Sequence, residues 1–245
     1  MDAVGRSDAV AFYDEAYSSG SLSRWRELSA KGKADHVEEL CRGLEPLRIV
    51  EIGCGDGALL AELSARGFAD ELSGYDISQA AVALARQRPI ARLGALDTFD
   101  GRRLPVPDRA FDLAILSHVL EHVDDPRALL AEAARSAARA IVEVPLEANA
   151  SARRASKRAG AAEIGHLQSL SRSDVRTLVR SAGLGVERDL LDPLPLSVHT
   201  FFAGGPLATA RATAKAALRR TIFVAAPRLA ERLFTLHYAA LLSSS

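Results

Sequence analysis

The sequence has few cysteines and no excess of charge of either sign. Only two cysteines, Cys41 and Cys54, occur among the 245 residues, so neither a disulfide framework nor a four-thiolate zinc site can form. The 31 lysines and arginines equal the 31 aspartates and glutamates, whereas proteins that bind nucleic acid mainly through its phosphates normally carry a basic excess. We therefore expect a cytoplasmic protein without a nucleic-acid partner.

Long hydrophobic runs are also missing. The first ten residues, MDAVGRSDAV, contain acids and lack the apolar core of a secretory signal. The longest stretch without Asp, Glu, Lys or Arg runs from Pro193 to Ala210, and prolines and glycines interrupt it, so it does not predict a membrane span. The 48% hydrophobic content instead suits one globular domain, with or without an appendage.

Short apolar runs alternate with helical patterns along the middle of the chain. The expected strands are 47–53, 71–76, 91–96, 111–117 and 140–145, and the expected helices are 58–66, 78–88 and 126–137. Strands separated by helices are connected by right-handed crossovers, so this order predicts a doubly wound α/β sheet with helices on both faces. Two further runs, 185–191 and 197–202, predict an antiparallel hairpin at the sheet edge.

Neither an internal repeat nor a linker divides the chain into independent domains. Three segments are expected: a helical cap at 1–44, the main domain at 45–205 and a helical extension at 206–245. Within the main domain, residues 147–168 have no clean period and predict a long loop over the site, and an S-x-x-D capping box at Ser171 and Asp174 then starts a helix. The extension is expected to pack on the domain, then to mediate a homodimer or to touch a membrane surface, in decreasing order of preference.

A glycine-rich turn follows the first expected strand. The segment VEIGCGDG, residues 50–57, places glycines at alternate positions just before a helix, where a nucleotide-like cofactor can approach the backbone. Gly53, Gly55 and Ala58 also satisfy the dinucleotide pattern G-x-G-x-x-G/A. Glu51 favours a different cofactor, because a carboxylate at the strand tip suits a cationic amino group better than a pyrophosphate.

A second acid follows the next strand. Asp76 ends the run ELSGYD, one crossover after Glu51, where an acid accepts hydrogen bonds from both ribose hydroxyls of a cofactor.

The rival function is a nicotinamide-dependent oxidoreductase. A short-chain dehydrogenase would need a Tyr-x-x-x-Lys pair, and none of the four tyrosines is followed by lysine four places later.

These motifs together resemble the class I S-adenosylmethionine-dependent methyltransferases. The resemblance covers roughly residues 45–190 and rests on VEIGCGDG, Asp76, Asp97 and the segment FDLAILSHVLEHVDDP at 111–126, which is typical of the small-molecule branch. It implies a Rossmann-like sheet of seven strands, mostly parallel with an antiparallel edge strand, and S-adenosylmethionine as cofactor.

The resemblance also implies which residues bind the cofactor. The methionine part would lie on Glu51, Gly53, Cys54 and Gly55, the ribose on Asp76 with Ile77, and the adenine beside Leu96 and Asp97, with Ser117 at the tip of the fourth strand. Asp97 is alternatively a turn-capping residue, in which case Asp100 takes its role. Tyr13 and Tyr17 could close over the cofactor as a lid, and Arg24 beside Trp25 could meet its carboxylate; packing in the core or a dimer is an equal alternative for these side chains.

The segment SHVLEH contains H-x-x-E-H, which is also an inverted zinc-peptidase signature. That signature needs both histidines on one face of a long helix, whereas here a strand ends and Pro126 soon follows. Glu143, Glu163 and His166 could supply a third ligand in principle. We nevertheless expect no metal.

Histidines near strand ends are the candidates for a catalytic base. Doubly wound folds bind ligands at the carboxyl ends of their strands, and His118 lies at the end of the fourth, so it is the first candidate. His166 at the end of the long loop is the second. A purely structural role for His118 at the pocket floor is an equal alternative.

The acceptor is expected to be a small molecule, with O-methylation favoured. The D/N-P-P-Y/F signature of methylation at exocyclic amines of DNA bases is absent from the fourth strand. The basic run at 152–160 is either a solvated surface or a site for an anionic substrate. A non-catalytic, cofactor-binding partner subunit is the alternative from outside the enzymes.

Overall fold

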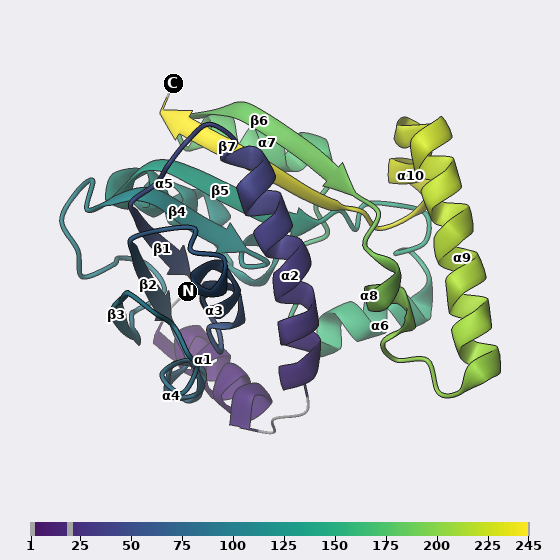
Figure 1. Ribbon diagram of the computed structural model, residues 1–245, viewed down its shortest axis with the longest axis horizontal. Coiled ribbons are helices and arrows are strands. Elements are labelled where there is room, and N and C mark those ends of the chain that lie inside the picture. The colour runs from purple at the N-terminus through teal and green to yellow at the C-terminus, as the bar shows by residue number, and fades with distance from the viewer. Residues whose placement is uncertain (1–2, 19–21, 245) are drawn as a thin grey trace.

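The computed structural model describes residues 3–18 and 22–244, and a seven-stranded sheet runs through its centre (Figure 1). In spatial order the strands are β3 (Leu93–Thr98), β2 (Glu71–Asp76), β1 (Arg48–Ile52), β4 (Phe111–Ser117), β5 (Ala137–Pro145), β7 (His237–Ser244) and β6 (Leu184–Asp192). β7 is antiparallel to both neighbours, and the other six strands are mutually parallel. The predicted doubly wound, mostly parallel sheet is therefore confirmed.

Helices cover both faces of the sheet. They are α1 (Ala3–Ser18), α2 (Ser23–Leu40), α3 (Ala58–Ala65), α4 (Gln79–Ala85), α5 (Pro126–Ser136), α6 (Ala155–Glu163), α7 (Arg172–Ser181), α8 (Leu196–Thr200), α9 (Pro206–Ala225) and α10 (Pro227–Leu233), with a short 3₁₀ turn at Leu120–His122. Successive residues of a strand point to opposite faces. Ile49 of β1 therefore packs with Val37 of α2 and Leu60 of α3, whereas Val50 belongs to the opposite core with Leu130 of α5.

The antiparallel strand comes from the end of the chain, which the sequence predicted to be helical. Residues 197–202 were predicted to form the second strand of a hairpin with 185–191. They lie instead in helix α8 and the turn after it, so the predicted hairpin is wrong. β7 lies one place in from the edge, between β5 and β6, and residues 238–242 are fully buried. A strand buried on both faces does not alternate apolar with polar residues, so its run YAALL cannot be distinguished from a helical segment by period.

The segment 147–168, predicted as a loop, contains helix α6. This helix buries none of its residues, so it has no apolar stripe that a sequence pattern could detect. The start of α7 agrees with the prediction. The Ser171 side chain accepts from the Asp174 N–H, and the Asp174 carboxylate accepts from the Ser171 N–H.

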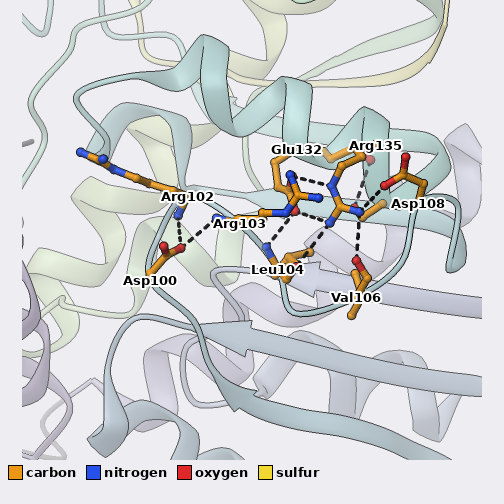
Figure 2. Close-up of polar contacts among 10 residues, drawn as sticks. Asp100, Arg102, Arg103, Leu104, Val106, Asp108, Glu132 and Arg135 are labelled. Atoms are coloured by element: carbon orange, nitrogen blue, oxygen red, sulfur yellow. Dashed lines mark hydrogen bonds and ion pairs between the residues drawn. The ribbon is translucent and has the colours of Figure 1, made fainter.

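An arginine of α5 fastens the segment that joins β3 to β4 (Figure 2). Arg135 donates to the carbonyl oxygens of Val106 and Leu104 at 2.9 and 3.3 Å, and its guanidinium also pairs with Glu132 and Asp108. The Glu132 carboxylate accepts the Leu104 N–H at 2.8 Å. This network ties the connection between β3 and β4 to helix α5.

Helices α9 and α10 stand at one side of the molecule, beside α8 (Figure 1). Each buries a single residue, Ala216 in α9 and Ala230 in α10. Arg219 of α9 donates to the Thr235 carbonyl at 2.7 Å and stacks on the Phe234 ring, so the helix is tied to the segment that leads into β7. Within 3–18 and 22–244, no helix is long and apolar enough to cross a membrane.

Candidate active site

A cavity of about 1080 Å³ lies at the carboxyl ends of β1, β4 and β5, where helices α1, α2, α6 and α9 enclose it. Its wall contains all six histidines of the sequence, namely His36, His118, His122, His166, His199 and His237. It also contains the predicted cofactor residues Tyr13, Glu51, Gly53, Cys54, Gly55 and Ser117. One cavity thus joins the glycine turn to a cluster of titratable side chains.

The glycine turn after β1 adopts backbone conformations that favour glycine. Gly53, Gly55 and Gly57 have φ angles of 78°, 54° and 71°. A Cβ atom at Gly53 would lie 2.6 Å from Val119 Cγ2, and one at Gly55 would lie 2.3 Å from the Tyr17 hydroxyl. A side chain at Gly53 or Gly55 would therefore collide with Val119 or Tyr17.

Glu51 is a buried carboxylate with an open hydrogen-bonding position. Glu51 is the next-to-last residue of β1, it is only 3% exposed, and its Oε2 has no hydrogen-bond partner among the described residues. Burial raises the pKa of Glu51 to about 8, and the nearby carboxylates of Asp76 and Asp56 act in the same direction. A ligand with a cationic amino group would satisfy this oxygen, so the residue fits the amino-acid part of S-adenosylmethionine.

Asp76 links the second strand to the glycine turn. Its carboxylate accepts the Gly55 N–H at 2.8 Å and the Ser78 N–H at 2.9 Å. A backbone hydrogen bond from Ile77 also acts on it, and since an ionised carboxylate has about four lone-pair sites, it keeps acceptor capacity for a ribose hydroxyl. Asp76 and Ile77 are themselves not among the residues of the cavity wall, so Asp76 reaches the cavity through the Gly55 backbone.

The residues predicted for the adenine lie on the neighbouring strand, outside the cavity wall. Leu96 and Asp97 pair with Gly74 and Tyr75 of β2. The Asp97 side chain is 68% exposed and lies 3.5 Å from Arg86, which also donates to the Leu96 carbonyl. Asp100, the alternative to Asp97, accepts the N–H groups of Arg102 and Arg103, so it caps its own turn (Figure 2).

Helices α1 and α2 form one wall of the cavity. Tyr13 and Tyr17 both line it, and Arg26 stacks on the Tyr17 ring at 4.1 Å and lies 3.8 Å from Asp56. Arg24, which the sequence proposed for the cofactor carboxylate, is exposed and lies outside the cavity wall. The arginine of this helix that lines the cavity is therefore Arg26.

Glu143 is the centre of a histidine cluster at the other end of the cavity. The residue is buried in β5, and its Oε1 lies 3.2 Å from His237 Nδ1, 3.3 Å from His36 Nδ1 and 3.6 Å from His118 Nε2. Ser117 donates to its other oxygen at 3.3 Å. Burial acts to raise the pKa of Glu143, but the surrounding histidines outweigh it and hold that pKa well below its usual range.

Both ring nitrogens of His118 have partners. Nδ1 lies 3.1 Å from Glu121 Oε1, and Nε2 lies 3.3 Å from His237 Nδ1. The His118 backbone has a φ of 59°, a left-handed conformation that is strained for a residue with a side chain. His36 lies between Glu143 and Asp192; burial alone would lower its pKa, but hydrogen bonds to these two carboxylates raise it to about 10.

A separate histidine–carboxylate pair follows α6. His166 Nδ1 lies 2.8 Å from Glu147 Oε2, and the ring packs against His122 with centroids 4.7 Å apart. The N–H groups of Leu167 and Gln168 both donate to the Glu121 carbonyl, so this segment is fastened beside the end of β4. The structure thus brings the two predicted base candidates, His118 and His166, into the same cavity.

Sequence patterns missed much of the histidine cluster. His36 and His237 come from α2 and from the strand that the sequence predicted to be helical, so no local motif connects them to His118. Glu143 did carry a signal, because a charged residue inside the apolar run AIVEVP must be buried and is rarely so without a partner.

A model of a family described as a methyltransferase domain matches residues 24–188, about two thirds of the chain. The chain belongs to this methyltransferase family. The prediction of a class I S-adenosylmethionine-dependent methyltransferase is thereby confirmed, and the nicotinamide-dependent alternative is set aside.

Several known methyltransferases are similar to the chain. The ubiquinone biosynthesis O-methyltransferase of Alkalilimnicola ehrlichii is 38% identical over an alignment of 141 positions, and the match covers 50% of this chain and 54% of that protein. The chain spans about half the length of the curated relatives it matches. Among solved structures, geranyl diphosphate C-methyltransferase from Streptomyces coelicolor has a TM-score of 0.63 at 14% identity, covering 88% of this chain and 76% of that one. Magnesium protoporphyrin IX methyltransferase from Synechocystis has a TM-score of 0.53 at 16% identity, covering 89% and 83%. At these identities the two structures support the fold alone.

Proposed function

We propose that this methyltransferase transfers a methyl group from S-adenosylmethionine to a hydroxyl oxygen of a small molecule in the histidine-lined cavity. The observation that carries the proposal is that one cavity contacts both Glu51 with its glycine turn and the histidine–carboxylate pairs beyond β4 and β5. The O-methyltransferase name of the Alkalilimnicola relative supports oxygen as the acceptor atom.

The residues after β1 and β2 would hold the methyl donor. The open oxygen of Glu51 would accept from its ammonium group, and the remaining lone pairs of Asp76 from its ribose hydroxyls. Tyr17 would cover the glycine turn, since its hydroxyl already lies over Gly55. When bound, S-adenosylmethionine supplies an electrophilic methyl group on a cationic sulfur, which departs as a neutral thioether. Displacement of this kind depends mainly on alignment.

His166 would act as the general base for the acceptor hydroxyl. Its Nδ1 faces Glu147, which would fix the tautomer and leave Nε2 to take the proton as the acceptor oxygen forms its new bond to carbon. The other candidate, His118, has both nitrogens engaged by Glu121, Glu143 and His237. We therefore favour His166 over His118, in the reverse of the order that the sequence suggested.

Four of the six lysines and arginines in the cavity wall lie at α6 and α9, and they support an acceptor that carries an anionic group. Arg154 and Lys157 come from α6 and its N-terminal boundary, and Lys215 and Arg219 come from α9. Burial lowers the pKa of Lys215, and the charges of the other three lower it further. Among the described residues, none of the four lies within ion-pair distance of a carboxylate. A carboxylate or phosphate on the acceptor would neutralise this group.

A panel of acceptors tests the proposal. Purified protein is incubated with S-adenosylmethionine labelled in its methyl group and with hydroxylated small molecules that do or do not carry a carboxylate or phosphate, with tRNA, and with protein. We expect label in an O-methyl ether of an anionic small molecule. Transfer only to nucleic acid or protein would contradict the proposal. Binding of S-adenosylhomocysteine without transfer to any member would instead favour a non-catalytic partner subunit.

A further inference from the structure

The histidine cluster around Glu143 has the composition and the spacing of a metal site. We propose that His118, Glu143 and His237 bind one divalent transition-metal ion at the acceptor end of the cavity. Their ligand atoms come from three separate elements and all lie within 4.8 Å of one another. Two histidines and one glutamate are a donor set used by zinc enzymes that keep one coordination position open.

The distances between the ligand atoms support this site. His118 Nε2, His237 Nδ1 and Glu143 Oε1 form a triangle with sides of 3.2, 3.3 and 3.6 Å. Zinc binds histidine nitrogen and carboxylate oxygen at about 2.0–2.2 Å, and a point about 2.0 Å from all three atoms exists near the centre of this triangle. An ion at this point would therefore meet all three ligand atoms at distances typical of zinc.

The surrounding residues are those that orient metal ligands. Carboxylates commonly orient the second ring nitrogen of a ligating histidine, and His118 Nδ1 lies at ion-pair distance, 3.1 Å, from Oε1 of buried Glu121, an oxygen that has no hydrogen-bond partner among the described residues. Ser117 holds the second oxygen of Glu143 at 3.3 Å, and His36 lies 3.3 Å from the first.

The proposed site differs from the one suggested by the H-x-x-E-H motif. That motif would use His118 and His122 together, whereas His122 Nδ1 lies 3.0 Å from the Gly165 carbonyl oxygen and its ring packs on His166. His118 instead joins Glu143 of β5 and His237 of β7. The sequence argued against a metal because the H-x-x-E-H motif is not on a long helix. The proposed site needs no such helix, because strands of the sheet bring its three ligands together.

An ion at this position would act on the acceptor. All three ligands line the cavity, so the open coordination position would face a hydroxyl group bound there. Coordination lowers the pKa of that hydroxyl and would assist its deprotonation by His166. This role rests on the proposed function, whereas the binding of the ion does not.

The test uses Co²⁺ and Zn²⁺ as probes. The full chain is stripped with a chelator and titrated with Co²⁺, whose visible absorption reports coordination by protein ligands, and the Zn²⁺ content is measured by mass spectrometry after dialysis. We expect one ion per chain. His118→Ala, His237→Ala and the isosteric Glu143→Gln should each weaken Co²⁺ binding at least tenfold, and Glu121→Gln should weaken it about 10–100-fold.

Matched controls keep the result interpretable. His199→Ala removes another histidine of the cavity, one whose Nε2 lies 3.1 Å from the Pro193 carbonyl, and should bind Co²⁺ like the wild type. Thermal melts and S-adenosylhomocysteine titrations of the same metal-free samples report the fold and the cofactor site. Wild type that binds no Co²⁺ while binding S-adenosylhomocysteine would overturn the metal site alone. Wild-type Co²⁺ affinity in His118→Ala, His237→Ala and Glu143→Gln would also overturn the metal site. So would a loss of Co²⁺ binding in His122→Ala but not in His237→Ala, because it would place the ion at the neighbouring group Glu121, His122 and His166.

Discussion

The two ends of the cavity are built in different ways. The proposed donor site consists of Glu51 and the glycine turn, which line the cavity, and of Asp76 behind that turn; these residues lie within 26 residues of one another at the carboxyl ends of two adjacent strands. The acceptor end gathers His36, His118, Glu143 and His237 from four elements spread along most of the chain. The first is a property of a local segment, and the second exists only after the sheet has formed. We therefore expect changes at the two ends to have separable effects.

Loss of the proposed base should have the largest effect, and it should fall on turnover alone. His166→Ala should lower turnover by about 10²–10⁴ while leaving the affinity for S-adenosylhomocysteine unchanged, because a positioned base acts only in the reaction. Steady-state kinetics and calorimetry on the same preparation check this. His199→Ala, which removes another histidine of the cavity wall, is the matched comparison and should keep near-normal turnover. Near-normal turnover in His166→Ala would move the base elsewhere.

A change at the proposed donor site should instead lower the affinity for the cofactor and leave turnover nearly unchanged. Glu51→Gln removes the carboxylate proposed for the ammonium group, and a hydrogen bond to a charged group contributes about 1.5–3 kcal/mol, so affinity should fall about 10- to 150-fold. Turnover at saturating cofactor should change much less. Calorimetric titration with S-adenosylhomocysteine measures the first quantity and kinetics the second. An unchanged affinity would separate Glu51 from the donor.

The burial of Glu51 also predicts a pH-dependent stability. Its pKa is about 8 in the folded chain and 4.5 in the unfolded one, so the folded state binds the extra proton. The stabilisation is fully present below pH 4.5 and is lost as pH rises to about 8. Urea unfolding from pH 5 to 8 should therefore show Glu51→Gln gaining stability relative to the wild type. A constant difference between the two proteins would contradict the raised pKa.

The cationic group of the acceptor end should give a smaller effect. Lys215→Ala should raise KM for an anionic acceptor about 2- to 5-fold, because a partly exposed charge pair contributes up to about 1 kcal/mol. KM for an uncharged acceptor should not change. Lys31→Ala, an exposed lysine outside the cavity wall, is the control. Equal effects of the two variants would argue against an anion site.

Asp97 should show the smallest effect. Its side chain is largely exposed and its ion pair with Arg86 is on the surface, so Asp97→Ala should change stability by less than about 1 kcal/mol. Cofactor affinity tests its predicted contact with adenine. A more than tenfold loss of cofactor affinity in Asp97→Ala would show that Asp97 contacts the cofactor.

The same contrast explains what the sequence could predict. The glycine turn, Asp76 and the capping box of Ser171 depend on residues close together in sequence, and all were identified with their elements. β7 was missed because its buried apolar run has no period, and α6 because it buries no face. His237 and His36 could not be grouped with His118, because only the insertion of β7 beside β5 brings the chain end to Glu143.

The most direct test of the account is the number of protons released when the donor product binds. At pH 7 a carboxyl with a pKa of about 8 is about nine-tenths protonated, so binding of an ammonium group beside Glu51 should expel nearly one proton. Calorimetric titration with S-adenosylhomocysteine in two buffers of different ionisation enthalpy counts it. We predict one ligand per chain, close to one proton released by the wild type and almost none by Glu51→Gln. Equal release by both proteins, or a wild type that binds NAD and not S-adenosylhomocysteine, would contradict the account.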